Sequence, residues 1–314
     1  MRCRVFSLAL LAFVLSPFVP LQAQTPEAAV HHFKNAVKKT GSGDLDGAIE
    51  DYSRAIALSS RFETRKQSGR NSGSSFAESD AASESIRVID PFTANAYSNR
   101  GLARYKKGDY AGALEDFNEA LRIRPGLAVA YLNRAAAYRA TGDIKSALKD
   151  LDRAIAINKD LFEAYNNRGS LLHDLGREAE ALSDLNRALE LNDRVAQTFF
   201  ERGYVHLALQ NFDAAIVDFE RSIKLEPNMA WAYHGRGTAQ MFKGEMQKAI
   251  DDLNIALEND PSIAWAYFNR GLAKVYLGDE PTAQKDFEEC LRLRPDLKDV
   301  LAAKVELARQ LRKK

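Results

Sequence analysis

Residues 97–125 read YSNRGLARYKKGDYAGALEDFNEALRIRP, and the same pattern begins again at Tyr131, Tyr165, Phe199, Tyr233 and Tyr267. An arginine recurs at this constant spacing, at Arg100, Arg134, Arg168, Arg202, Arg236 and Arg270. An aspartate follows each arginine, also at a constant distance, at Asp116, Asp150, Asp184, Asp218, Asp252 and Asp286. Self-similarity at one fixed period is typical of a helix-turn-helix unit stacked on copies of itself. The sequence therefore predicts an all-α array of stacked helix pairs.

The positions around these charges fit two packed helices in each unit. Apolar residues at helical spacing give each helix one buried stripe. A small residue such as Gly101 follows each arginine and lets the paired helices approach closely. We expect most first helices to end at a glycine in the left-handed backbone conformation, at Gly108, Gly142, Gly176, Gly244 and Gly278.

The unit resembles the tetratricopeptide repeat, whose pattern is aromatic-x2-Leu-Gly, then Ala-x3-Phe, then Pro. Here the pattern is Tyr97-x2-Arg100-Gly101, Ala113-x3-Phe117 and Pro125, with arginine in the place of the family's leucine. The resemblance covers nearly all of residues 31–297 apart from one insertion. It implies a right-handed superhelical solenoid of stacked antiparallel helix pairs. It also implies that the first helices line a concave groove that holds a protein or an extended peptide.

The repeat phase divides the chain into five segments. We predict a signal peptide over residues 1–23 and a degenerate first unit over 24–60. A flexible Ser/Gly-rich insertion follows over 61–85, because its composition cannot bury enough apolar surface to order itself. Residues 86–297 hold the rest of the first unit and six regular units, and residues 298–314 form a capping helix. The insertion is either a tolerated surface loop or a binding segment.

The N-terminal segment 1–23 predicts export. Arg2 and Arg4 precede a short apolar run that ends near Leu15, and a small residue, Ala23, closes the segment. This order is typical of a cleaved secretory signal peptide. The alternative is a membrane anchor, but the run is shorter than the roughly 20 residues needed to span a bilayer. We expect a periplasmic or secreted protein with no transmembrane segment after cleavage.

Composition and motifs argue against several functional classes. A formal net charge of +1 gives no electrostatic reason to expect nucleic acid or an anionic membrane as partner. The sequence contains no phosphate loop, serine elbow, paired-cysteine motif or metalloprotease motif, and its histidines lack metal-ligand spacing. We therefore predict no catalysis, no cofactor and no metal. Cys290 stands where most other repeats carry alanine, which favours a small buried residue.

The recurring charges predict a structural ladder of ion pairs. The first unit has Asp51 but no arginine of its own, and the last helix carries Lys304 at the arginine spacing. We therefore predict that each aspartate pairs with the cation of the following unit, from Asp51–Arg100 to Asp286–Lys304. The alternative is a row of arginines that binds a ligand.

Asparagine recurs in the predicted groove beside the arginines. The positions are Asn99, Asn133, Asn167 and Asn269. A side-chain amide offers one donor and one acceptor group, as a peptide bond requires. The row resembles the asparagine ladder by which some superhelical members of this family hold extended peptides. The alternative is that these asparagines have a structural role or none.

The later part of the predicted groove is aromatic. The residues are Phe200, Tyr204, Trp231, His234, Phe242, Trp265, Phe268 and Tyr276. Large aromatic side chains exposed on a concave surface favour a binding site. The alternative is that curvature of the array or self-association buries them.

These features predict a non-catalytic scaffold of the cell envelope that holds a protein or an extended peptide in its concave groove. One alternative is a structural subunit that self-associates into a homo-oligomer. Another is an accessory subunit that regulates an envelope enzyme or a secretion or assembly machine.

Overall fold

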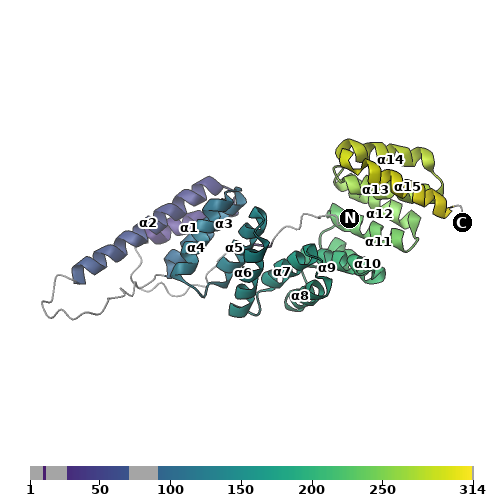
Figure 1. Ribbon diagram of the computed structural model, residues 1–314. Coiled ribbons are helices and arrows are strands. Elements are labelled where there is room, and N and C mark those ends of the chain that lie inside the picture. The colour runs from purple at the N-terminus through teal and green to yellow at the C-terminus, as the bar shows by residue number, and fades with distance from the viewer. Residues whose placement is uncertain (1–9, 12–26, 71–90, 313–314) are drawn as a thin grey trace. The chain divides into compact units, whose positions relative to one another are not determined.

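The computed structural model describes residues 10–11, 27–70 and 91–312. This part of the chain contains fifteen α-helices, one short 3-10 helix and no strand (Figure 1). The first six helices are α1 Glu27–Gly41, α2 Leu45–Arg70, α3 Pro91–Lys106, α4 Tyr110–Ile123, α5 Ala128–Thr141 and α6 Ile144–Ile157. The next six are α7 Phe162–Asp174, α8 Glu178–Leu191, α9 Ala196–Ala208, α10 Phe212–Leu225, α11 Ala230–Phe242 and α12 Met246–Asn259. The last are α13 Ala264–Leu277, α14 Glu280–Leu293, the 3-10 helix η1 Pro295–Leu297 and α15 Lys298–Arg312.

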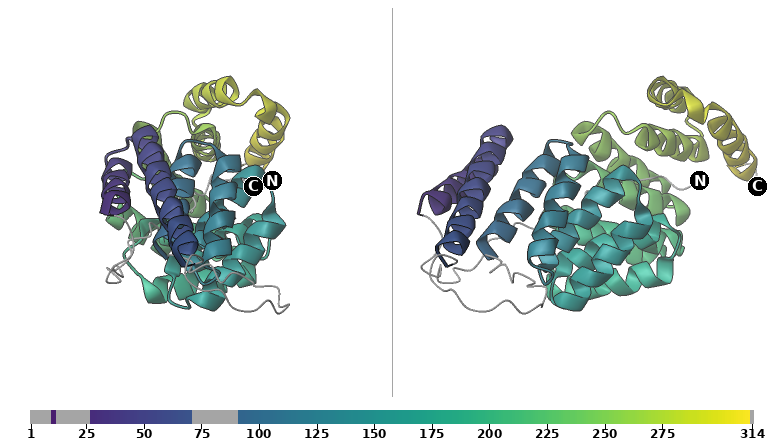
Figure 2. Two further views of the ribbon diagram at one scale, coloured as in Figure 1. Left: turned by 90° about the vertical axis from the view of Figure 1, so that its left-hand side faces the viewer. Right: turned by 60° about the vertical axis from the view of Figure 1, so that its left-hand side comes forward.

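The helices pack as successive pairs within two compact parts, and the boundary between these parts in the sequence lies within α7. The N-terminal part ends at Asn167 and the C-terminal part begins at Arg168. In the N-terminal part α1 packs on α2, α3 on α4 and α5 on α6, and α2 and α4 also pack on the first helix of the next pair (Figure 2). In the C-terminal part α9 to α14 repeat this order, and α15 packs on α13. The predicted all-α solenoid is confirmed.

The turns inside the pairs follow the predicted chemistry. Six glycines have a φ of 75–89°, and these are Gly43, Gly108, Gly142, Gly176, Gly244 and Gly278. The predicted left-handed glycines are therefore confirmed. Gln210 fills this place between α9 and α10 with a φ of 59°, the only positive φ of a non-glycine residue in the described ranges. After the turn, the carboxylate of Asp143 accepts a hydrogen bond from the Ser146 N–H and caps α6.

Close helix approach explains the small residue that follows each arginine. A Cβ atom added to Gly101 would lie 2.9 Å from the ring of Phe117 on the partner helix. At Gly271 it would lie 2.3 Å from the ring of Phe287. In these two pairs the second helix therefore packs an aromatic ring directly against the backbone of the first helix, and at Gly169 a leucine, Leu185, takes the place of the ring.

The beginning of the predicted insertion differs from our expectation. The structure continues α2 to Arg70, through the first part of the segment predicted as a loop. Residues 61–68 include arginine, glutamate, lysine and glutamine and no glycine or proline, and such a composition propagates a helix once it has begun. The rest of the insertion, and the predicted signal peptide apart from residues 10–11, lie outside the described residues.

Candidate functional site

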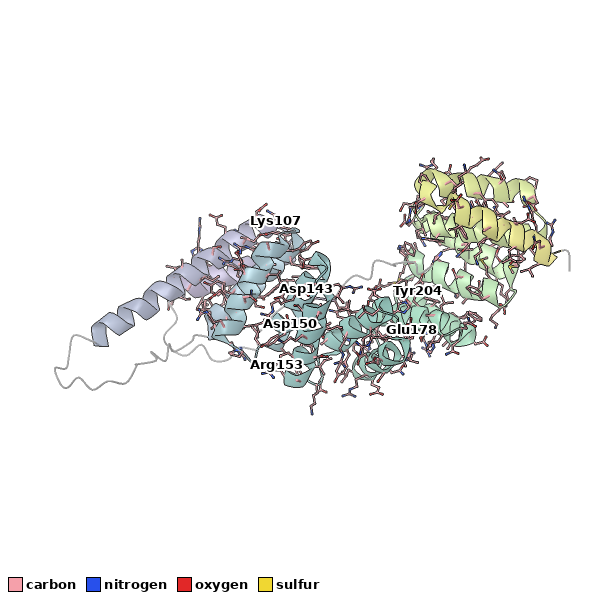
Figure 3. All side chains as sticks on the ribbon, in the orientation of Figure 1. Lys107, Asp143, Asp150, Arg153, Glu178 and Tyr204 are labelled. Atoms are coloured by element: carbon pink, nitrogen blue, oxygen red, sulfur yellow. The ribbon has the colours of Figure 1, made fainter. Side chains whose placement is uncertain are left out.

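The recurring arginines and aspartates form ion pairs inside each helix pair. Arg134 on α5 donates from Nε and Nη2 to the two carboxylate oxygens of Asp150 on α6, at 2.7 and 2.8 Å (Asp150 is labelled in Figure 3). The same two-point contact joins Arg100 to Asp116, Arg168 to Asp184, Arg202 to Asp218, Arg236 to Asp252 and Arg270 to Asp286. The predicted pairing between neighbouring units is therefore wrong.

The arginines do link neighbouring pairs, but through a different residue. A residue two positions after the aspartate lies roughly 200° around the helix and faces the first helix of the next pair. There Arg134 Nη1 donates to Asn118 at 2.7 Å, and Arg100 Nη1 donates to Ser53 at 2.9 Å. Arg202 with Asn186 and Arg270 with Asn254 repeat the contact, each at 2.8 Å. The recurrence of asparagine at 118, 186 and 254 was the sequence signal for these contacts.

Five of the six ladder arginines, Arg100, Arg134, Arg202, Arg236 and Arg270, also lie over an aromatic ring three residues earlier on the same helix. The guanidinium carbon of Arg100 lies 5.3 Å from the centre of the Tyr97 ring, and Arg236 lies 5.6 Å from that of Tyr233. Burial raises the pKa of Asp116, and contact with Arg100 opposes that rise. Since both charges are engaged inside the array, the ladder is structural and presents no free row of arginines to a ligand.

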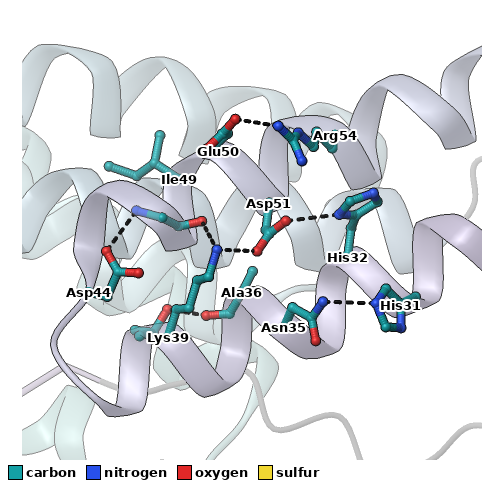
Figure 4. A network of polar contacts seen from close by, with 12 residues as sticks. His31, His32, Asn35, Ala36, Lys39, Asp44, Ile49, Glu50, Asp51 and Arg54 are labelled. Carbon is teal, nitrogen blue, oxygen red and sulfur yellow. Dashed lines mark hydrogen bonds and ion pairs between the residues drawn. The ribbon is translucent and has the colours of Figure 1, made fainter.

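The two ends of the ladder also differ from the prediction. Asp51 accepts hydrogen bonds from His32 Nδ1 at 2.8 Å and Lys39 Nζ at 2.7 Å, not from the next unit (Figure 4). Burial acts to raise the pKa of Asp51, but Lys39 and His32 outweigh it and hold the pKa below its usual value. At the other end, Asp286 pairs with Arg270 and Lys274, and the predicted partner Lys304 is exposed.

Three of the four predicted asparagines lie in the N-terminal part, at the same position of successive first helices. Asn99 on α3 and Asn133 on α5 are each 1% exposed, and Asn167 on α7 is 5% exposed. Asn99 lies beside the buried hydroxyl of Tyr52. Burial raises the pKa of Tyr52 to about 12, and Thr40 and Asn99 act in the opposite direction. Asn99 therefore belongs to the core between the first two pairs.

Asn167 contacts the main chain of the N-terminal segment. The Leu10 N–H donates to Asn167 Oδ1 at 2.9 Å, and Asn167 Nδ2 donates to the Leu10 carbonyl oxygen at 2.7 Å. Both polar groups of one peptide residue are thus satisfied by a single amide side chain. Leu10 and Leu11 are outside any helix and are half-buried. This is the two-point contact expected of an asparagine that holds an extended peptide.

Further polar groups on the first helices α3 and α7 are buried without a hydrogen-bond partner among the described residues. Asn166 is fully buried, and its Oδ1 and Nδ2 have no hydrogen-bond partner among the described residues. The same holds for Ser98 Oγ and Asn95 Oδ1 on α3. A buried polar group without a partner costs about 1–3 kcal/mol. These groups are therefore suited to a ligand with its own donors and acceptors.

Asn269, the fourth predicted asparagine, is engaged inside the C-terminal part. Its Nδ2 donates to Thr238 Oγ1 at 2.9 Å and lies 3.2 Å from His234 Nε2. His234 Nδ1 lies 3.1 Å from the hydroxyl of Tyr204. Burial lowers the pKa of His234 to about 4, so the imidazole is neutral near pH 7. A neutral ring that accepts from Asn269 at Nε2 carries its proton on Nδ1 and donates to Tyr204.

The residues on the preceding first helix explain this difference. His234 and Thr238 lie one repeat before Asn269, and the residues at the same two positions before Asn167 are Leu132 and Ala136. Neither leucine nor alanine has a side-chain hydrogen-bonding group. Asn167 therefore has no polar side chain at these two positions, and its amide contacts a peptide instead.

Most of the predicted aromatic groove is packed rather than open. Phe200 and Phe268 are buried at 3% and 4% exposure, and His234 is buried at 3%. The side chains of Tyr204, Trp231, Trp265 and Tyr276 are half-buried against the core clusters of the C-terminal part. Only Phe242 among these eight residues is strongly exposed, and it stacks on Phe212 with ring centres 5.0 Å apart. The expectation of a row of exposed aromatics is wrong, because neighbouring pairs cover these rings.

The described residues contain no candidate metal centre, and their one cysteine is buried. Within residues 10–11, 27–70 and 91–312, no three His, Cys, Asp or Glu side chains gather in a way that suits a metal ion. Cys290 is buried, and burial raises the pKa of its thiol to about 11, which disfavours the reactive thiolate. Among the described helices, none combines the length and the apolar character that crossing a bilayer requires.

Known proteins share this architecture. Models of the tetratricopeptide repeat match residues 92–160, 162–194, 196–229 and 266–297. A tetratricopeptide repeat protein from Parabacteroides merdae is similar over 90% of this chain and 99% of its own, with 21% identity and a TM-score of 0.58. PilF of Pseudomonas aeruginosa is similar over 64% of this chain and 92% of its own, with 22% identity and a TM-score of 0.59.

A third solved structure is YrrB, described as a tetratricopeptide repeat protein with an unusual peptide-binding site. It is similar over 61% of this chain and 98% of its own, with 23% identity and a TM-score of 0.51. A comparison with curated proteins finds no match. The matched repeats together cover more than half of the chain and coincide with the helix pairs described above. The chain therefore belongs to the tetratricopeptide-repeat proteins.

Proposed function

We propose that this chain is a non-catalytic binding scaffold that holds an extended peptide by its main chain. The observation that carries the proposal is the two-point contact between the Asn167 amide and the main chain of Leu10. Because the contact uses the N–H and C=O that almost every residue offers, it favours an extended conformation over a particular sequence. The half-buried side chains of Leu10 and Leu11 indicate that the bound segment can be apolar.

The surrounding polar groups support the same function. The buried amide of Asn166 needs a donor and an acceptor that the described residues do not supply. A second peptide group of the same ligand would supply both. Tetratricopeptide-repeat proteins generally act as protein-binding scaffolds, and the similar fold of YrrB carries a peptide-binding site by its own description. The similarity to the fold of YrrB is consistent with peptide binding by this chain.

We further propose that this scaffold works in the cell envelope, in the periplasm or after secretion. The support is the order of features in residues 1–23, a basic start, a short apolar run and a small residue at the exit. Fractionation of cells that express the full chain tests this location. An intact N-terminus on a cytoplasmic product would contradict it.

The peptide-binding proposal is tested with a labelled peptide that carries residues 6–14 followed by a short lysine tail for solubility. Asn167→Leu keeps the approximate size of the side chain but removes both hydrogen-bonding groups. Measured in the full chain with Leu10→Pro, which deletes the N–H that contacts Asn167, we expect Asn167→Leu to weaken peptide binding about tenfold, since two neutral hydrogen bonds contribute on the order of 1–3 kcal/mol. Asn269→Leu is the matched control and should leave the affinity unchanged. Equal affinities of the Leu10→Pro chains with and without Asn167→Leu would overturn the proposal.

Self-association is a second candidate function, and one observation favours it. Leu209, Phe242 and Leu277 lie at or just after the ends of first helices in the C-terminal part and are 38%, 66% and 53% exposed. Exposed apolar residues gathered on one side of a protein indicate an interaction surface. Sedimentation of the parent chain and of Phe242→Ser over a range of concentrations tests this candidate. A monomer at all concentrations would exclude it.

A further inference from the structure

We infer that the N-terminal segment around Leu10 is a built-in ligand of the Asn167 contact and closes it as long as the segment remains on the chain. This inference rests on the proposed function, because it assigns an occupant to the same peptide-binding contact. The occupant is a segment of this chain that carries the strongest apolar run of the sequence. Its removal would open the contact to a peptide from another protein.

The geometry of the contact is that of a ligand rather than of a core residue. Leu10 lies far from Asn167 in the sequence. The contact joins the main-chain N–H and C=O of Leu10 to the side-chain amide of Asn167, and a peptide from another protein could offer the same two main-chain groups. The N–H and C=O of Leu10 are available because residues 10–11 are outside any helix. In a helix these two groups would bond to residues four positions away and could not reach a side-chain amide. The contact therefore requires that Leu10 lies outside a helix, as it does in the structure.

The first helix of the preceding pair, α5, explains why this contact forms on α7. Leu132 and Ala136 on α5 hold the positions from which His234 and Thr238 engage Asn269. They cannot hydrogen-bond to Asn167 through their side chains, and both side chains are apolar. An apolar extended segment thus matches the chemistry of these positions better than a charged one.

Attachment to the same chain makes this ligand effective. A tethered ligand competes at an effective concentration of the order of millimolar, without any new contact. If the segment alone binds at about 0.1 mM, the tether weakens the binding of a free peptide about tenfold. The uncleaved chain would therefore bind partner peptides poorly.

The consequence is a link between processing and binding. In the proposed export route, the cleavage that removes residues 1–23 also removes Leu10. The contact is then open in the compartment where a partner is met and closed in the precursor. No rearrangement of the helix pairs is required for this change.

The test uses the full chain and a substitution that removes one hydrogen bond of the tethered ligand. Leu10→Pro deletes the N–H that donates to Asn167. Leu10→Ala is the matched control, since it shortens the side chain and keeps the N–H. With the labelled residue 6–14 peptide as probe, we expect Leu10→Pro to bind about tenfold more tightly than the parent chain. Leu10→Ala should raise the affinity less.

Hydrogen exchange gives a second, independent readout on the parent chain. The amide of Leu10 should exchange at least tenfold more slowly than in an unstructured peptide, and Asn167→Leu should abolish this protection. A fully exposed Leu10 amide, together with equal probe affinities of Leu10→Pro and the parent chain, would overturn the inference. The proposed function would still hold in that case if Asn167→Leu weakened probe binding. If Asn167→Leu left probe binding unchanged, the proposed function itself would fail.

Discussion

Asn167 and Asn269 occupy the same position of the repeat, yet they do different things. The amide of Asn167 contacts the main chain of Leu10, whereas the amide of Asn269 contacts Thr238 and His234 inside the C-terminal part. The difference lies in the preceding first helix, which offers histidine and threonine before Asn269 but leucine and alanine before Asn167. A recurring residue in a repeat array therefore has a role only together with its neighbours one period away.

The ladder of arginine–aspartate pairs runs through both parts of the molecule, and here we expect the two parts to behave alike. Asp150→Ala in the N-terminal part and Asp252→Ala in the C-terminal part each leave a partly buried arginine without its carboxylate. We expect a loss of about 3–5 kcal/mol for each, because an uncompensated buried charge is strongly unfavourable. Chemical denaturation measures this loss.

A double-mutant cycle then locates the pairing. Arg202 should couple strongly to Asp218, its partner at 2.7 Å. It should couple only weakly to Asp184, which pairs with Arg168. Strong coupling between Arg202 and Asp184 would restore the pairing between units that the sequence first suggested.

The closed site of Asn269 should respond to pH through His234. Burial holds the pKa of this imidazole near 4, below the ordinary value of 6.5, so the fold favours the neutral form. Stability is therefore fully present above about pH 6.5, is lost as the pH falls toward 4, and levels off below that value. The loss amounts to at most about 3 kcal/mol.

His234→Phe is the informative variant for this pH dependence. Phenylalanine already stands at the equivalent position in the neighbouring units, at Phe200 and Phe268. Thermal unfolding between pH 7 and 4 should show a smaller decrease for the variant than for the parent chain. An identical decrease in the two proteins would assign the pH dependence to another group.

An exchange of neighbours should convert the open site into a closed one. Leu132→His with Ala136→Thr places the two partners of Asn269 at the corresponding positions before Asn167. In the Leu10→Pro chain, we expect the new hydrogen bonds to compete with the added peptide and to weaken its binding about tenfold, or roughly 1.4 kcal/mol. The Asn167→Leu chain carrying the same two changes is the control, since it should show no further loss. Unchanged affinity of the double variant would break the comparison.

The smallest expected effect concerns the scaffold of the C-terminal part. Gln210 adopts the left-handed conformation that glycine adopts in the other turns. Gln210→Gly should raise the free energy of unfolding by about 1 kcal/mol, because a residue with a Cβ is strained there. Peptide affinity should not change. A loss of stability would mean that the glutamine side chain makes a contact worth more than the strain.

The period of the sequence was enough to predict the helix pairs, the left-handed glycines and the close approach at Gly101. It was not enough to predict the partner of each arginine. Arg202 lies between Asp184 and Asp218 at nearly equal distances along the sequence, so both pairings fit the spacing. The orientation of the second helix decides between them, because Asp218 faces its own first helix. That orientation is a property of packing rather than of spacing.

The candidate site was predicted only in part for a related reason. Asparagine was recognised as suited to peptide groups, but its availability depends on contacts with side chains of the preceding repeat. The same applies to the aromatics: Phe200 and Phe268 were placed on the first helices correctly, yet neighbouring helices bury them. A sequence pattern gives the face of a helix, and the adjacent pair determines whether that face is open.

The most direct test follows the side-chain amide signals of Asn167 and Asn269 by nuclear magnetic resonance. The sample is the full chain with Leu10→Pro, which frees Asn167, titrated with the residue 6–14 peptide. Our account predicts that the Asn167 signals shift in proportion to bound peptide while those of Asn269 stay in place. Equal shifts at both residues, or a peptide that binds without moving the Asn167 signals, would contradict it.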